Sequence, residues 1–529
     1  MAQIKETILE FRASSPSMQG LAMALGSSPT RPPPSPRMVS SLRRKMAKAI
    51  GLTKKQAEKH HPASTWRYEI VKQVMDAAND PDKWVHKWLE SGFPVGIKLP
   101  LEPGGLLPRI DEQASLTPED LEDKARWSHN HQSFDTPEGT AQPAHELLLD
   151  LVDKGYAYVF KDLAAAEAWL GAPVFVSPLG DVVKQRPDGT HKHRLIMDLR
   201  ASEVNATSRV QERQVLPRFV DHARDVALLS CQNVELGVLV LDYQNAFMTL
   251  PLADEEMGCN ASVMPQGLTR TRAPLLENEA ETGEVLLWRV LGFGGHSNPL
   301  AYARAASFAA RSAQALLSTS SASADGCAAG RLQLYVDDPI LTLAGTRHEQ
   351  ELSLDLVVAW WLCLGIPLSW DKGVFVDAVQ PHDWIGVSFR CTSPGTCTMT
   401  IPTKFRSELL QLAECFASSS RRTATLVQAH ALCGKAGRLS QVVPEARPFT
   451  TALFAALAAS IRASSQKHRE APPLRWQYRG IAWQPDGWWP CSEKSPSPCS
   501  TPTTSTASSF LSPRPRWSST PPLGAEELS

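Results

Sequence analysis

The sequence predicts an α+β fold, in which a β-rich centre is flanked by helical segments on both sides. Apolar residues recur at helical spacing before residue 90 and again after residue 402. Between them, short β-rich runs end at acidic residues, most clearly in GVLVLD, which ends at Asp242, and in LQLYVDDPILTL. The 529 residues, 43% of them apolar, suffice for several domains with sizeable cores.

Composition and charge exclude several classes of protein. Lys plus Arg (54) nearly equals Asp plus Glu (55), so any nucleic-acid-binding surface must come from local clustering. Ten scattered cysteines without a CxxC pair argue against a disulfide framework or structural zinc. No secretion signal is visible, and Asp355 interrupts the apolar stretch Leu352–Leu368, which predicts a buried helix and no membrane span. We expect an intracellular protein, cytoplasmic or nuclear, without a membrane partner.

The first 135 residues divide into two predicted regions. Residues 1–62 combine a Ser/Pro-rich stretch with the basic run RRKMAKAIGLTKKQAEKHH and few apolar positions, which predicts a disordered arm. The basic run could contact nucleic acid or serve nuclear import, although most such runs are only solvated. In residues 63–135, apolar positions such as Trp66 and Ile70 predict a small helical region.

Residues 140–235 are predicted to form the first part of a larger domain of mixed helices and strands. An amphipathic pattern from Ala144 to Lys154 predicts a helix. β-branched and aromatic residues after it predict short strands over residues 156–160, 174–176 and 194–199.

Residues 236–395 are predicted to form the second part of this domain, beginning with the strand GVLVLD. Two stretches of polar or small residues, 269–284 and 318–330, are interpreted as surface insertions. Helical patterns return in residues 400–465. Residues 471–529 are rich in Pro, Ser and Thr and predict a low-complexity tail.

Three carboxylates stand out against this background. Asp337 and Asp338 lie between two apolar runs, so a tight hairpin would present both at its tip, and such a pair needs a compensating cation. Asp242 ends an apolar strand, where an unpaired charge is costly unless it binds a metal or has a partner. An acidic turn without a ligand is the simpler alternative at both places. Pro339 removes a backbone donor next to the pair, which is tolerable at the first position of a strand.

Carboxylate oxygens suit Mg²⁺, and two such ions about 3.5 to 4 Å apart are the requirement of nucleotidyl transfer. Asp242 and Asp337 would bind both ions, and Asp338 would be a weaker or outer ligand. Mn²⁺ is a possible substitute. The carboxylates alone therefore favour a two-metal nucleotidyltransferase.

Six segments, in order, resemble the motifs of the reverse transcriptases of retroviruses and retrotransposons. They are similar to the fingers motif, motifs A to D and the primer grip, and read KHRLIMDLRASEVN, DYQNAF, LGFGGHSNPLAYARAAS, YVDD, LGIPLSWDKGVF and WIGVSF. The resemblance implies a right-hand polymerase, with fingers in residues 140–235, a palm with an antiparallel sheet in 236–395 and a partial thumb or connection in 400–465. Motif B, with Phe before Gly, is more similar to long-terminal-repeat or tyrosine-recombinase retrotransposons than to retroviruses.

The resemblance assigns roles to charged residues. It implies that Asp242, Asp337 and Asp338 are the catalytic, metal-binding carboxylates and that Lys372 protonates the departing pyrophosphate. It also implies that Arg194 binds the triphosphate of the incoming nucleotide with Lys192 as a helper, whereas without it both would be read as solvated charges.

The resemblance assigns three further residues to the nucleotide. Phe247 would be the steric gate that leaves no room for a ribose 2′-hydroxyl, although a Phe in such a place is more often part of a core. Gly294 would let the backbone approach the nucleotide, and Phe293 would shape the start of the helix after it.

The predicted function is that of an RNA-directed DNA polymerase within a retroelement polyprotein, adding deoxynucleotides to a primer on an RNA or DNA template. A ribonuclease H domain is expected to be absent or broken, because the few acidic residues after Ala471 lack a strand context. Two alternatives stay open: a decayed or domesticated copy that binds nucleic acid without polymerising, and an RNA-dependent RNA polymerase, against which Phe247 argues. The sequence does not predict the oligomeric state.

Overall fold

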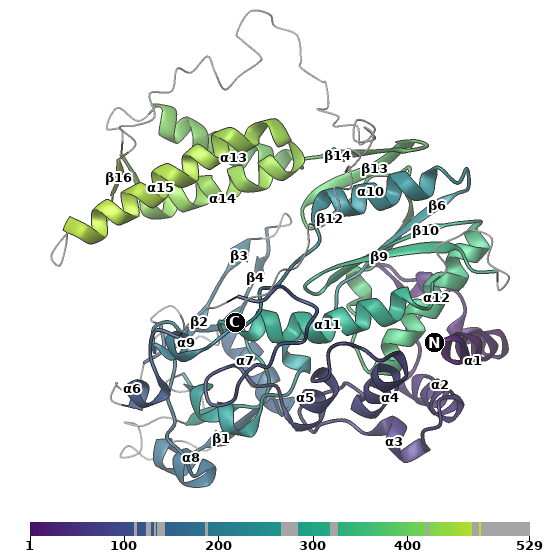
Figure 1. Cartoon of the computed structure of the whole chain (residues 1–529), viewed down its shortest axis with the longest axis horizontal. Helices are drawn as coiled ribbons and strands as arrows, with labels where there is room; N and C mark the ends of the chain where they lie inside the picture. Colours follow the sequence, from purple (N-terminus) through teal and green to yellow (C-terminus); the bar gives the residue numbers. More distant parts are fainter. Residues whose placement is uncertain are drawn as a thin grey trace, which may run out of the picture. The chain divides into compact units, whose positions relative to one another are not determined.

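The computed structural model in Figure 1 describes residues 1–110, 114–122, 129–131, 134, 143–185, 189–265, 284–317, 326–418, 423–467 and 475–477. The chain forms two compact units, each built from segments distant in sequence. The first unit comprises Met1–Arg218 and Val234–Asp377, and the second comprises Phe219–Asn233 and Ala378–Ser529. The predicted mixture of helices and antiparallel strands is confirmed in the described residues.

A four-stranded antiparallel sheet forms the centre of the first unit. Its order is β11 (Val374–Asp377), β6 (Leu236–Val240), β10 (Asp338–Ala344) and β9 (Ala329–Tyr335). Four of the five residues of β6 are buried, as expected for an apolar strand with a partner on each side. Helices α11 (Asn298–Gln314) and α12 (Arg347–Leu364) pack against these strands (Figure 1).

The N-terminal region contradicts the prediction of a disordered arm in residues 1–62. Its apolar side chains, among them Ile4, Ile8, Leu42 and Met46, are almost fully buried in the same core as α11 and α12. The prediction was wrong because these apolar positions, although few, recur every three or four residues on helices whose partners lie hundreds of residues away. The helices up to residue 91 are α1 (Ala2–Ser14), α2 (Pro36–Ala49), α3 (Lys54–Glu58), α4 (Tyr68–Ala78) and α5 (Val85–Ser91).

Asp355, on the predicted buried helix α12, joins that helix to the N-terminal segment. Its carboxylate, 1% exposed, accepts hydrogen bonds from Arg12 Nε at 2.6 Å and from the backbone N–H groups of Gly20 and Leu21 at 2.9 and 2.7 Å. Burial raises the pKa of Asp355, and the bonds from Arg12 and Leu21 oppose that shift. The carboxylate of Asp355, which interrupts the apolar stretch, therefore holds α12 against the first 21 residues.

The first unit also contains a smaller sheet of order β1 (Ala157–Phe160), β8 (Val285–Trp288) and β7 (Ala261–Val263). The predicted helix over 144–154 and strand over 156–160 are confirmed as α7 (Pro143–Asp153) and β1, whereas the predicted strand over 174–176 is reduced to a single bridge at Val176. Three short helices, α6 (Pro118–Glu122), α8 (Leu163–Leu170) and α9 (Val204–Thr207), also belong to this unit. Strands β2 (Leu179–Asp181) and β5 (Leu195–Met197) form a two-stranded antiparallel sheet, and β3 (Lys184–Gln185) and β4 (His191–Lys192), which lie between them in the chain, form another.

The second unit contains a three-stranded antiparallel sheet, β12 (His382–Trp384), β13 (Val387–Ser393) and β14 (Thr396–Thr400), against which α10 (Phe219–Ser230) packs. His222 of α10 and His382 of β12 are buried with their Nε2 atoms 3.0 Å apart. The predicted helices in residues 400–465 are confirmed as α13 (Thr403–Ser418), α14 (Leu426–Val442) and α15 (Arg447–Lys467).

Some predicted boundaries differ from the structure. Residues 219–233 were predicted with the fingers, and residues 378–395 with the palm, yet both belong to the second unit because α10 packs on β13 and β14. Gly330, the predicted end of an insertion, lies in β9. Within the predicted tail, β16 (Arg475–Gln477) pairs with β15 (Thr423–Thr425). Residues 269–283 and 318–325 of the insertions, and the rest of the tail, lie outside the described residues. No described helix has the length and hydropathy needed to cross a bilayer.

Candidate active site at the carboxylate hairpin

The three predicted carboxylates come from two neighbouring strands. Asp242 follows the end of β6, and Asp337 and Asp338 form the turn and the first residue of β10. The backbone N–H of Leu241 donates to the Pro339 carbonyl at 3.1 Å, and that of Tyr243 donates to the Asp337 carbonyl at 2.9 Å. Because these bonds fall on either side of Asp242, they hold it level with the Asp337–Asp338 pair. The predicted grouping of the carboxylates is therefore found in the backbone register.

The turn that carries Asp337 has an unusual conformation. Tyr335 and Asp338 are paired, so Val336 and Asp337 form a two-residue turn. Val336 has a φ of +57°, in the left-handed region that β-branched residues rarely adopt and that costs on the order of 1–3 kcal/mol. Pro339 still pairs with Leu334 across the hairpin, so its missing N–H does not interrupt the strand.

Like charges dominate the electrostatics of this hairpin. Burial, followed by the charge of Asp242, raises the pKa of Asp337. Burial and the charges of Asp337 and Asp242 raise the pKa of Asp338 to about 7. Lys372, in the short helix Trp370–Lys372 before β11, forms an ion pair with Asp242 and opposes both shifts. The site thus holds more negative charge than Lys372 neutralises, which is the condition under which a cation binds.

This excess charge predicts a pH-dependent cost in stability. Because its folded-state pKa is raised, Asp338 binds a proton more tightly in the folded than in the unfolded chain, so its contribution to stability falls as pH rises from about 4 to about 7. Asp338→Asn should therefore stabilise the metal-free protein at about pH 8 by roughly 1–2 kcal/mol, solvent screening included, and much less at about pH 4. Urea unfolding in the presence of a chelator measures both values. An equal gain at the two pH values would contradict the prediction.

Two further cations act on the carboxylates, one from the β3–β4 hairpin and one from the residues that link β4 to β5. The charge of Lys192 lowers the pKa of Asp338, and that of Arg194 lowers the pKa of Asp337. The backbone of Arg194 is fixed by reciprocal hydrogen bonds with Val182 at 2.9 and 3.1 Å, and its side chain is exposed. Both predicted triphosphate-binding residues are therefore close enough to the carboxylates to interact with them electrostatically.

An aromatic cluster lies beside the carboxylates. Phe247, in the short helix Ala246–Thr249, contacts Phe293 at a ring distance of 5.5 Å and Tyr302 of α11 at 4.9 Å. Tyr302 is buried, and its pKa is raised by burial and then by the charges of Tyr243, Asp337, Asp242 and Asp338. Phe293 stays 41% exposed. The predicted gate residue therefore packs on Tyr302, which is close enough to the carboxylates to interact with them electrostatically, and on the partly exposed Phe293.

Gly294 occupies a position that no other residue can take without displacing the backbone. Its φ is +128°, and a Cβ atom there would lie 1.9 Å from the carbonyl oxygen of Met197. Asn205, in the segment that resembles the fingers motif, donates to the Gly294 carbonyl at 2.9 Å and accepts from the His296 N–H at 2.8 Å. The fingers-like and motif B-like segments are thus joined by hydrogen bonds.

The remaining predicted motif lies elsewhere. The WIGVSF segment forms the turn between β12 and β13 of the second unit, where Arg438 donates to the Ile385 carbonyl. Among the described residues, no three His, Cys, Asp or Glu side chains are arranged to hold one metal ion. The carboxylate site is therefore defined by its register and its electrostatics.

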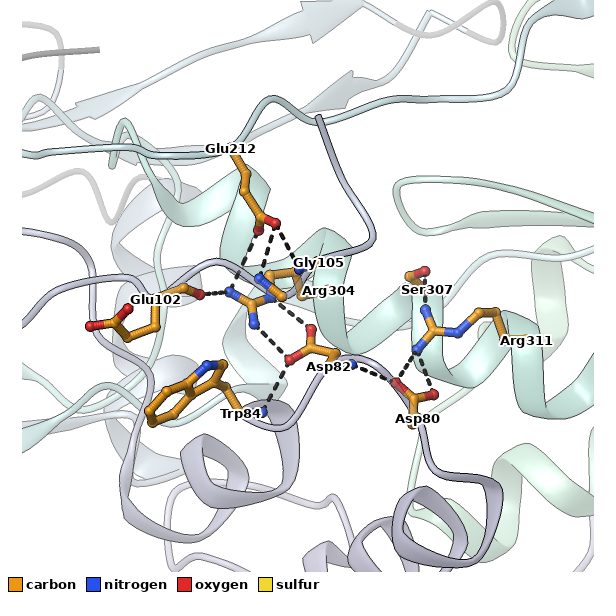
Figure 2. Close-up of polar contacts among 10 residues, drawn as sticks. Asp80, Asp82, Trp84, Glu102, Gly105, Glu212, Arg304, Ser307 and Arg311 are labelled. Atoms are coloured by element: carbon orange, nitrogen blue, oxygen red, sulfur yellow. Dashed lines mark hydrogen bonds and ion pairs between the residues drawn. The ribbon is translucent and has the colours of Figure 1, made fainter. Parts of the chain in front are cut away.

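Sequence reasoning missed a buried charge network that supports α11. Figure 2 shows Arg304 between Asp82 and Glu212, all three about 2% exposed or less. Arg304 donates to both oxygens of Asp82, at 2.6 and 2.7 Å, lies 3.7 Å from Glu212, and stacks over Trp88 at 4.4 Å. Glu212 also accepts from the N–H groups of Gly104 and Gly105.

A second pair extends this network along the same helix. Arg311 donates to both oxygens of Asp80, at 2.8 and 3.0 Å, and Asp80 also accepts from the N–H of Asp82 (Figure 2). The network fixes α11, which carries Tyr302, to the turn before α5. The one sequence signal was two Arg residues seven positions apart on a helix that is otherwise rich in Ala.

Neither protein-family models nor curated protein sequences match this chain. Among solved structures, the fold is similar to that of a foamy viral protease-reverse transcriptase. The dRH form with double-stranded DNA has a TM-score of 0.41 at 16% identity and covers 69% of this chain and 48% of that one. The complex of the foamy viral protein with double-stranded DNA has a TM-score of 0.36 at 17% identity and covers 59% of this chain and 50% of that one. The complex with an RNA/DNA hybrid has a TM-score of 0.38 at 16% identity and covers 77% of this chain and 42% of that one. The chain thus spans about half the length of these proteins, and the likeness does not assign it to a family.

Proposed function

We propose that the chain is an RNA-directed DNA polymerase that adds deoxynucleotides to the 3′-hydroxyl of a primer. The observation that carries the proposal is the group of three carboxylates on adjacent antiparallel strands. Burial and the charge of Asp242 raise the pKa of Asp337, and burial and the charges of Asp337 and Asp242 raise that of Asp338. Such an excess of negative charge in one place costs stability in the absence of a cation, so a function that needs the cation explains why it is kept.

The donor set fits Mg²⁺. Asp242, Asp337 and Asp338 supply only oxygen ligands, which a hard cation prefers. Because their side chains are not arranged around one ion in this structure, they would have to turn towards a common point to hold two ions, Mn²⁺ being a possible substitute. When bound, the ions would lower the pKa of the primer 3′-hydroxyl and neutralise charge on the leaving pyrophosphate.

The other residues of the site have roles that follow from their charge and position. Arg194 and Lys192 act electrostatically on the carboxylates and would orient the triphosphate against them. Lys372, half exposed and paired with Asp242, would release that carboxylate to the metal and donate a proton to pyrophosphate. Phe247, packed on Tyr302, would lie beneath the sugar.

Primer extension by the full chain tests the proposal. A labelled DNA primer is annealed to an RNA template and, separately, to a DNA template, and incubated with the four deoxynucleoside triphosphates and Mg²⁺ or Mn²⁺. We expect extension to the template end on the RNA template, and none when the divalent ion is removed with a chelator. Tight binding of the primer–template without extension under either ion would instead support a copy that binds nucleic acid and does not polymerise.

Sugar selectivity provides a separate test of Phe247. Phe247→Val should raise ribonucleotide incorporation by roughly 10- to 100-fold, about 1.4 to 3 kcal/mol of relaxed discrimination, because the ring that excludes the 2′-hydroxyl is removed. The ratio of kcat/KM for ribo- and deoxynucleotides measures this effect. If Phe247 only packs on Phe293 and Tyr302, both activities fall together with the melting temperature and their ratio stays constant.

A further inference from the structure

The segment from α2 to α3 concentrates positive charge in a nearly neutral chain. Between Pro36 and Lys59 there are eight Lys or Arg residues and one acidic residue, Glu58, whereas the whole chain has a net charge of −1. Seven of the eight basic side chains are exposed, and only Arg43 is buried. The local charge is therefore strong enough to act on a polyanion even though the overall charge is not.

Several charges of this segment already have partners. Arg43 donates to Glu58 and to the carbonyls of Leu362 and Cys363, at the C-terminal end of α12. Lys45 lies over the Phe11 ring, and Lys59 pairs with Glu69 at 2.9 Å. Arg43 thus holds the segment against the core while neutralising its one carboxylate.

Other cations of this segment keep their charge uncompensated. Arg44 donates only to the Ser40 carbonyl of its own helix, and no acidic side chain of the described residues pairs with Lys54 or Lys55. Three cations on neighbouring helices therefore face solvent without a carboxylate of their own.

These three side chains surround one hollow. It has a volume of about 460 Å³, opens widely to solvent, and is lined by Ser40, Arg44, Lys54, Lys55, Glu58 and Lys59. Its walls come from α2 and α3, which pack on each other (Figure 1). A hollow of this size with cations from two helices can receive a phosphate and its neighbours along a chain.

We propose that this hollow, formed by α2 and α3, binds the phosphodiester backbone of a nucleic acid, as a contact separate from the carboxylate site. Arg44, Lys54 and Lys55 would each neutralise a phosphate, and Ser40 offers a hydroxyl to a non-bridging oxygen. Binding of this kind is independent of base sequence, because no aromatic or amide side chain lines the hollow.

The exposed surface of these helices favours nucleic acid over an anionic membrane. Membrane-surface helices insert an apolar face, but the apolar face of α2, with Val39, Leu42 and Met46, is buried in the core. No large hydrophobic side chain between residues 36 and 59 is exposed. The segment therefore offers charge without an apolar surface for lipid.

The test measures binding of the full chain to a fluorescent single-stranded RNA of about 20 nucleotides, without primer or nucleoside triphosphates, over a series of salt concentrations. The triple variant Arg44→Gln, Lys54→Gln, Lys55→Gln should bind at least about 10-fold more weakly at low salt. The slope of log K against log salt should fall by about 2, since each lost phosphate contact on a single strand removes roughly 0.7.

A matched control removes the same charge elsewhere in the first unit. Lys72→Gln, Lys87→Gln, Lys161→Gln changes three exposed lysines outside the hollow and should leave the slope nearly unchanged. If the slope of log K against log salt falls equally in both triple variants, the effect comes from net charge and the proposed contact is refuted. Equal melting temperatures of the three proteins exclude a folding defect.

Two more outcomes separate this proposal from others. Binding of the chain to phosphatidylserine vesicles is measured in parallel. If the Arg44, Lys54, Lys55 variant loses vesicle binding but keeps RNA binding, the proposal is overturned in favour of a membrane contact. The RNA-binding assay contains no primer or nucleotides, so it can be interpreted even if the chain fails to extend primers. Weaker RNA binding in the Arg44, Lys54, Lys55 variant alone would support the RNA contact in that case too.

Discussion

Replacing Asp337 with Asn should lower the rate of primer extension by at least about a thousandfold while raising the melting temperature of the metal-free protein. The loss follows because a neutral amide contributes no charge to a cation at the site, and charge stabilisation there is worth several kcal/mol. The gain in stability follows because the amide would not repel Asp242 and Asp338, and this repulsion contributes to the raised carboxylate pKa values here. Single-turnover extension and thermal unfolding with a chelator measure the two effects.

The opposite signs of these two effects distinguish a catalytic from a structural role. A carboxylate that only supports the hairpin would give lower activity and lower stability together. Asp371→Asn is the matched control, because Asp371 is exposed and lies next to Lys372 but has no part in the proposed metal site. We expect this variant to extend primers at close to the wild-type rate, and a comparable loss in both variants would contradict the assignment of Asp337.

Replacing Arg304 with Met should lower the free energy of unfolding by about 3–5 kcal/mol. Met fills a similar volume, but it leaves Asp82 and Glu212 buried without their cation, and an uncompensated buried charge is far more costly than the loss of the pair itself. Urea unfolding followed by circular dichroism measures the change. Because α11 also carries Tyr302, the variant should lose nucleotide addition even under conditions in which it remains folded.

Two comparisons identify the cause of this loss. Arg311→Met removes a neighbouring pair in which Arg311 is 33% exposed and Asp80 10% exposed. Asp80 keeps its hydrogen bond from the Asp82 N–H, so we expect a smaller loss than for Arg304→Met, about 1–3 kcal/mol. Adding Asp82→Asn to Arg304→Met should recover part of the stability, because the second change removes the stranded charge. Asp82→Asn alone has its own cost in free energy of unfolding. If that full cost is also seen when Asp82→Asn is added to Arg304→Met, the two residues do not interact as proposed.

Local sequence patterns were sufficient for the elements around the carboxylates. Alternating and apolar runs predicted β6, β9 and β10, and the position of Asp242 at a strand end and of Asp337 in a hairpin turn followed from the same runs. Charge alone did not place Arg194 and Lys192 near the site. Their proximity depends on the β3–β4 hairpin, and the resemblance to reverse transcriptase motifs was needed to predict it.

Contacts between distant residues could not be predicted. The first 62 residues were expected to be disordered because their apolar content is low, but a few buried apolar side chains and the bond between Arg12 and Asp355 give them a fixed place. Likewise, Arg304 and Asp82 are 222 positions apart, and each alone has the pattern of an ordinary solvated charge. Partners at such separations are selected by the tertiary fold, which periodicity and propensity do not encode.

The bond between Arg12 and Asp355 also sets an order of events during synthesis. The two residues are 343 positions apart, so α1 leaves the ribosome well before the helix that completes its core. At about 5 to 20 residues per second, this interval is roughly 20 to 70 seconds. During it, Ile4, Ile8 and Phe11 have no native partner on α12, and transiently exposed apolar side chains of this kind favour aggregation. The core around α1 is therefore completed only after a further 343 residues beyond Arg12 have been synthesised.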